Sequence, residues 1–223
     1  MGAGLGDRGN DPRPLFGLAP EVMKPTALVL NILVATIGTI RFARAGCFDW
    51  RLFWPFALGS IPLAFLGGAI QLHERAYQYL VAVALLVAAW RLLLAGHEPP
   101  TREAPHPGVA LPVGAGLGLV SGLTGVGGGI FLSPLLLFLR WANMRTTAAV
   151  SAAFILINSI AGLAGLITTG VNLPQGLSWM VLAALGGAVV GSELAVRRLA
   201  PVRLRQLLGI VLVIAAVKMI LPA

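Results

Sequence analysis

The chain has 223 residues, of which 57% are hydrophobic and 11% are charged, and its mean hydropathy is +0.88. Soluble domains usually spend about a quarter of their residues on charge, so this composition excludes a water-soluble globular protein and predicts an integral membrane protein. The net charge is +8, but most arginines stand in short breaks between apolar stretches, which is typical of membrane topology and not of a nucleic-acid-binding surface.

Apolar, nearly charge-free stretches divide the chain, and a membrane-spanning helix needs about 20 residues. The stretch over 146–192 is too long for one crossing and contains turn-like sequence from Gly170 to Gly176, so it predicts two helices. The stretch over 108–139 is too long for a straight helix across a hydrocarbon core about 30 Å thick, so it must tilt, break or fold back. We expect an all-α membrane protein with about seven transmembrane helices plus a glycine-rich broken or re-entrant helix pair. The stretches are Pro25–Ile40, Leu52–Leu72, Ala76–Trp90, Gly108–Leu139, Thr146–Ser192 and Gln206–Val217.

Glycines determine how we interpret the long stretch over 108–139. Gly114, Gly118 and Gly122 recur every four residues, a spacing that lets a helix pack closely against a neighbour. The segment 125–129 then contains four glycines, and each glycine destabilises a helix interior by about 1 kcal/mol. Unwound backbone at membrane depth is tolerated where protein buries it or where it lines a wet cavity. The sequence therefore predicts two glycine-rich half-helices that meet at 125–129.

The basic loops predict how this segment crosses the membrane. Arginines collect around Arg44, Arg140 and Arg203, and basic residues mark the cytoplasmic side. The loop over 170–176 carries no charge. All three basic loops lie on one side only if the segment 108–139 enters and leaves by that side as a hairpin.

Two pairs of similar segments occur in the same order along the chain. Residues 23–27 (MKPTA) resemble 144–148 (MRTTA), and residues 63–69 (LAFLGGA) resemble 182–188 (LAALGGA). The shared order favours a duplication, with a first repeat over 1–107 and a second repeat over 108–223. With the hairpin, the helices after Lys24 and Arg145 cross in opposite directions, which gives the inverted repeats common in secondary transporters.

The glycine run and the segments after it resemble the signature of a known family. Residues 122–129 read GLTGVGGG, then 134–136 read PLL and 147–151 read TAAVS. This pattern is similar to the sulfite exporter TauE/SafE family, also called the toluene sulfonate uptake permease family. The resemblance implies a bacterial inner-membrane protein that moves sulfite, sulfonates or related sulfur-containing organic anions. It also implies a glycine-rich element in both halves, and the first repeat here lacks the N-terminal half-helix expected before Pro14.

Candidate binding residues follow from these patterns. Glycine-rich turns and helix N-termini present free backbone amides to anions, although the same glycines could serve close packing or form a hinge. Polar residues in the helix after Arg145 fall near one face, and such residues also act as contacts between helices without binding substrate. Lys24 and Arg145 stand at matching helix starts, where a cation can attract anions or set topology. The predicted substrate-binding residues are Gly125, Gly127, Gly128, Gly129, Thr147, Ser151, Asn158 and Asn31.

The predicted function is transport of small anions by alternating access of two related halves. An anion channel and a non-transporting membrane subunit of a larger complex remain open alternatives. No enzyme activity, cofactor or metal site is expected, because the three histidines lack metal-ligand spacing and the glycine run is neither a P-loop nor a dinucleotide fingerprint. The expected partners are a small anionic substrate, the lipid bilayer and, as an open possibility, further copies of this chain, but no nucleic acid. The expected location is the bacterial inner membrane, as a multi-pass protein.

Overall fold

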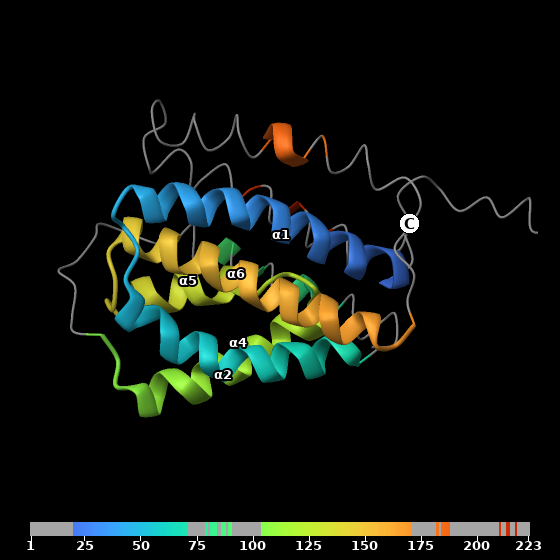
Figure 1. The fold of residues 1–223 in the computed structure, drawn as a ribbon, viewed down its shortest axis with the longest axis horizontal. Coiled ribbons are helices and arrows are strands. Elements are labelled where there is room, and N and C mark those ends of the chain that lie inside the picture. The colour runs from blue at the N-terminus through green and yellow to red at the C-terminus, as the bar shows by residue number, and fades with distance from the viewer. Residues whose placement is uncertain are drawn as a thin grey trace, which may run out of the picture.

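The computed structural model describes residues 20–70 and 104–170, together with short helical pieces within 79–90, 182–187 and 210–217. All regular structure in these parts is helical, which confirms the all-α prediction, and the long helices form one bundle (Figure 1). The second helix predicted in 146–192 and the helices predicted at 76–90 and 206–217 lie largely outside the described residues. The long elements are α1 (Pro20–Arg44), α2 (Trp50–Ala69), α4 (Pro107–Thr124), α5 (Gly129–Phe138) and α6 (Met144–Ile167).

Four of these helices are long and apolar enough to cross a membrane. The candidate spans, which lie in α1, α2, α4 and α6, contain 21, 20, 18 and 24 residues, or about 27–36 Å at about 1.5 Å per residue. Helix α5 has only 10 residues and reaches about half that length. The predicted break in 108–139 is therefore confirmed, but only its second arm has the length of a half-helix.

Helices α1 and α6 run in opposite directions. Gly38 late in α1 lies against Ala152 early in α6, whereas Leu28 early in α1 lies against Gly162 late in α6. This is the relation that the inverted-repeat prediction requires of these two helices. The repeat itself and the number of membrane crossings stay predictions.

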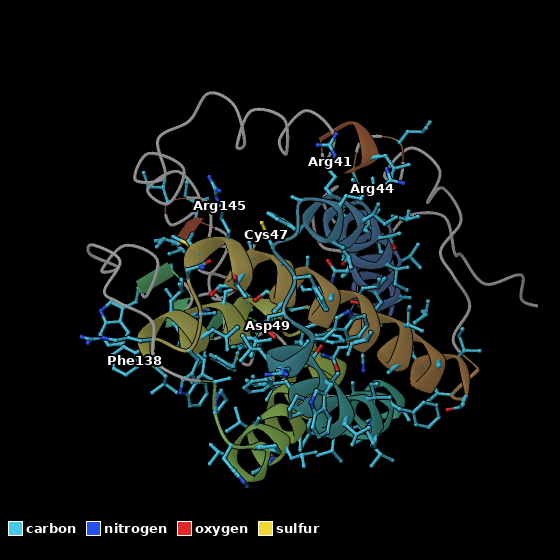
Figure 2. The ribbon with its side chains drawn as sticks, turned by 60° about the vertical axis from the view of Figure 1, so that its left-hand side comes forward. Arg41, Arg44, Cys47, Asp49, Phe138 and Arg145 are labelled. Carbon is cyan, nitrogen blue, oxygen red and sulfur yellow. The ribbon has the colours of Figure 1, made fainter. Side chains whose placement is uncertain are left out.

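Helix α5 folds back along α6. The backbone at Gly129 approaches Ile155, and the hydroxyl of Ser133 lies 2.7 Å from that of Ser151. Helix α4 lies alongside α2 and runs in the same direction as α6, whereas α5 runs in the opposite direction. The α4–α5 unit is therefore a hairpin, and α5 ends near the end of the bundle at which α4 begins (Figure 1). Arg41 and Arg44 at the end of α1 and Arg145 at the start of α6 all lie at that end, which comes forward in Figure 2. The loop around Arg203 lies outside the described residues.

The close packing of α4 on α2 explains its three regularly spaced glycines. The two helices run parallel, and a Cβ on any of these glycines would overlap a carbonyl oxygen of α2. Glycines on α2 make the same approach to α4 from the other side. Backbones that meet this closely gain dispersion and Cα–H···O contacts that offset the poor helix propensity of glycine. The pairs are Gly114 with Phe56, Gly118 with Ser60, Gly122 with Ala64, Gly59 with Leu111 and Gly67 with Leu119.

A buried apolar cluster fixes α5 in the bundle. Phe56 of α2, Leu132 and Leu136 of α5, and Val150 and Phe154 of α6 are fully buried and belong to this cluster. Within a bilayer these side chains stabilise the bundle by van der Waals packing against one another, because lipid tails are as apolar as the side chains themselves. Helix α5 is therefore held mainly by side chains, whereas α4 also meets α2 backbone to backbone.

Helices α1 and α5 end in the same motif but with different residues. After α1, Gly46 (φ 68°) donates to Ala43 and Cys47 donates to Phe42, which is a Schellman motif. After α5, the left-handed position is taken by Arg140 (φ 61°), the one positive-φ residue other than glycine in the described part of the chain. An L side chain there strains the backbone.

Candidate functional site

The break between α4 and α5 is built from glycines in left-handed conformation. Gly125 caps the C-terminus of α4 with φ 72°, and Gly128 caps the N-terminus of α5 with φ 74°. Gly127 between them has φ 81°. Since residues with a Cβ rarely adopt this region, the turn depends on all three glycines. Three of the four glycines predicted as a binding element therefore form the break, and the fourth, Gly129, begins α5.

Free backbone amides gather at the start of α5. The N-cap Gly128 has no side chain, so no side-chain cap accepts a hydrogen bond from the first turn of α5. Among the described residues, the amides of Gly127 and Gly128 also donate to no acceptor. Unpaired amides and the helix dipole together make a helix N-terminus attractive to anions. The break thus offers hydrogen-bond donors at the N-terminus of α5, within a bundle of membrane-length helices.

Asn31 connects α1 to the break. Its Nδ2 donates to the carbonyl oxygen of Gly125 over 3.1 Å and lies 3.3 Å from the point where a Cβ of Gly127 would stand. The predicted site residue from the first half is therefore next to the predicted glycines. One amide hydrogen of Asn31 fixes the turn, and the other remains for a further acceptor.

Two buried serines, which the sequence analysis did not select, flank the same turn. Ser159 Oγ lies 3.0 Å from the Cβ position of Gly127, and Ser121 Oγ lies 3.3 Å from that of Gly128. Both residues are 0% exposed, and neither hydroxyl has a hydrogen-bond partner within the described parts of the chain. Ser121 could have been noticed because it lies four residues before Gly125, and Ser159 because it follows Asn158.

Asn158 is buried in the helix interface. Its Nδ2 donates to Phe154 O of its own helix over 2.9 Å, while its Oδ1 has no partner among the described residues. Phe154 approaches Gly128 and Gly162 approaches Gly122, so Asn158 lies between two contacts of α6 with the α4–α5 unit. Its role in binding stays a prediction.

Ser151 and Thr147 lie progressively farther from the turn. The Ser151 hydroxyl pairs with that of Ser133, which also donates to Gly129 O over 2.8 Å. Thr147 is buried, but 12 residues of helix separate it from Ser159, which is about 18 Å along the axis. The structure therefore joins Ser151 to the first turn of α5 and does not bring Thr147 to the break.

The two cations at matching helix starts have different surroundings. The Lys24 ammonium is buried, and it donates to the carbonyls of Gly67, Gly68 and Ile70 at the end of α2 over 3.0–3.1 Å. These three bonds use all the donors of the group, so Lys24 caps α2. Its Cγ also lies 3.2 Å from the Cβ position of Gly125. Arg145 is exposed in the first turn of α6 (Figure 2), whereas the break contacts the middle of α6, at Phe154 and Ile155.

Comparison with known proteins gives a consistent result. The model of the family described as "Sulfite exporter TauE/SafE" matches residues 14–219. "Probable membrane transporter protein y4hK" of Sinorhizobium fredii (strain NBRC 101917 / NGR234) is 36% identical over 211 residues, which cover 92% of this chain and 85% of that protein. "Probable membrane transporter protein YjnA" of Bacillus subtilis (strain 168) is 24% identical over 230 residues, which cover 92% of this chain and 87% of that protein. No solved structure matches the chain.

The family match covers the break, its glycines and the helices that contact it, and α1, α2, α4 and α6 have membrane-spanning length. The chain is accordingly a multi-pass membrane protein, and it belongs to the sulfite exporter TauE/SafE family.

Proposed function

We propose that this membrane transporter carries small anions, such as sulfite, sulfonates or other sulfur-containing organic anions, across the bacterial inner membrane by alternating access. Membership of the family supports the sulfur anion, and the names of both relatives support transport. The observation that carries the proposal is the break at Gly125–Gly128, where unpaired amides at the N-terminus of α5 stand among membrane-length helices.

The chemistry of the break suits a transported anion better than a permanently bound one. Taking an anion out of water is costly unless donors replace its hydration shell. Amides and hydroxyls replace part of that shell without a fixed opposite charge, so capture is weak enough for release on the other side. The atoms closest to the Cβ positions of Gly127 and Gly128 belong to uncharged side chains.

Movement between two states would use the same turn. Helix α4 is held to α2 by backbone contacts, while α5 meets α6 through side chains such as Ile155 and Phe154. Side-chain contacts can rearrange by rotamer changes, whereas interlocked backbones cannot. The glycines between α4 and α5 would then act as the hinge around the anion.

The test is uptake into sealed proteoliposomes that contain the purified full chain, with sulfite, sulfate, thiosulfate and small sulfonates offered in turn. We expect saturable uptake of at least one sulfur oxyanion and accelerated exchange when the unlabelled anion is preloaded. Uptake without saturation or counterflow would indicate a channel. Copurification of a stoichiometric partner protein, with no uptake by the chain alone, would favour the subunit alternative.

A further inference from the structure

We propose that the hydroxyls of Ser121 and Ser159 bind the transported anion and complete, with the amides of Gly127 and Gly128, an uncharged site for a polyatomic oxyanion. The inference rests on the proposed function and adds two ligands and a substrate chemistry to it. Both serines lie in helices that flank the break, Ser121 in α4 and Ser159 in α6.

The unpaired state of these hydroxyls is unusual for buried serines in helices. A helical serine can donate to a carbonyl three or four residues earlier, and Ser60 and Ser133 do so, to Ala57 O at 3.1 Å and Gly129 O at 2.8 Å. Ser121 and Ser159 are more deeply buried than Ser133 yet make no such bond. Burying a hydroxyl without a partner costs free energy, so two unpaired hydroxyls beside one turn indicate a missing acceptor.

The positions of the two hydroxyls fit one small acceptor. They approach adjacent residues of the turn, Ser159 at Gly127 and Ser121 at Gly128, whose Cα atoms are about 3.8 Å apart. The same two residues supply amides without acceptors among the described residues. Four donors from α4, the turn and α6 therefore lie at two adjacent residues, and Asn31 Nδ2 stands 3.3 Å from the Cβ position of Gly127.

Donors from several directions select the shape of the ligand. An oxyanion of tetrahedral or pyramidal sulfur offers separate oxygens to separate donors, whereas a halide accepts all of them at one centre. Hydroxyl and amide hydrogen bonds are directional, so this arrangement favours the oxyanion. Within the described part of the chain the one lysine ammonium, that of Lys24, already donates to three carbonyls, so selectivity comes from geometry more than from net charge.

The test measures binding and stability in the same variants. The purified full chain in detergent is titrated with methanesulfonate, sulfite and, for comparison, chloride, and its thermal midpoint is recorded without and with each anion. The variants are Ser121→Ala, Ser159→Ala and the control Ser60→Ala, which removes a buried hydroxyl that has a partner. We expect each of the first two to weaken oxyanion binding at least about tenfold, or about 1.4 kcal/mol, while the ligand-free midpoint stays the same or rises. Ser60→Ala should keep wild-type oxyanion affinity.

The outcomes separate this inference from the proposed function. If the wild type binds and transports an oxyanion and both serine variants bind it equally well, the two hydroxyls are not ligands, although the chain remains an anion transporter. Chloride binding as strong as methanesulfonate and sulfite binding overturns the oxyanion geometry. If the wild type neither binds nor transports any sulfur anion, the proposed function fails and the serine ligands fail with it.

Discussion

Two glycines of α4 permit a matched test of how this helix is held. Gly118 packs on the backbone of α2, where a Cβ would overlap the carbonyl of Ser60, whereas a Cβ on Gly116 would meet nothing within 4 Å. The two residues belong to the same helix and are two positions apart. Replacing each by alanine therefore adds the same methyl group to two different environments.

The expected effects have opposite signs. In both variants alanine improves helix propensity by about 1 kcal/mol, and at position 116 nothing opposes this gain. At position 118 the methyl group meets a backbone carbonyl that cannot rotate away, and overpacking of this kind costs about 1–3 kcal/mol or more. The same close approach of α4 to α2 repeats at Gly114 and Gly122. A methyl group that separates the two helices at position 118 therefore weakens the contacts at these two glycines as well.

Gly118→Ala should therefore be less stable than Gly116→Ala by about 1–3 kcal/mol. The measurement is the unfolding free energy of each variant in mixed micelles, with the wild type in the same series. Anion uptake by the folded fraction gives a second readout, since Gly118→Ala should also displace the turn that follows α4. Equal stability of the two variants, or greater stability of Gly118→Ala, would refute the close packing of α4 on α2.

Further predictions concern the turn, a helix end, the buried lysine and the buried asparagine. Gly128→Val should abolish uptake while the protein still inserts, because Gly128 has φ 74° and a Cβ would stand 2.9 Å from Phe154; normal uptake by the inserted variant would remove the turn from the mechanism. Arg140→Gly should raise the unfolding free energy by about 1 kcal/mol by relieving the left-handed arginine, and a lower thermal midpoint would contradict this. Lys24→Met should lower the unfolding free energy by about 1–3 kcal/mol, because the carbonyls at the end of α2 lose their donor; unfolding in micelles checks it, and an unchanged value would show that Lys24 is not a cap. Asn158→Asp should weaken anion affinity more than Asn158→Ala does, because a carboxylate would repel the substrate, and equal affinity of both variants and the wild type would mean that Asn158 does not touch the anion.

The break could be predicted from sequence because its cause is local. Left-handed conformations at Gly125, Gly127 and Gly128 need residues without a Cβ, and a dense run of glycines is the direct signature of such a need. The length of α4 could not be predicted in the same way. Its glycines suggest a weak helix by propensity, but packing on α2 outweighs that preference and keeps 18 residues helical.

The candidate site was only partly predictable, because its members meet through tertiary contacts. Asn31 was selected, and it does lie at the turn. Ser159 was missed, since the polar face traced through Thr147, Ser151 and Asn158 is displaced from the face of α6 that meets Gly127. That face depends on how α5 folds back along α6, and no local pattern fixes the rotation of α6 about its axis.

Lys24 shows why a residue at a membrane edge needs its tertiary partners before its role can be assigned. In sequence it is a lone cation at a helix start, which predicts topology or attraction of anions. In the structure its ammonium closes the end of α2, and its stem packs on Gly125. One side of the turn is therefore fixed by two sets of contacts. Glycines join α2 to α4, and Lys24 joins α1 to the ends of both helices. On the other side α5 is held mainly by side chains, so a change of state at the turn should move α5 and leave α4 in place.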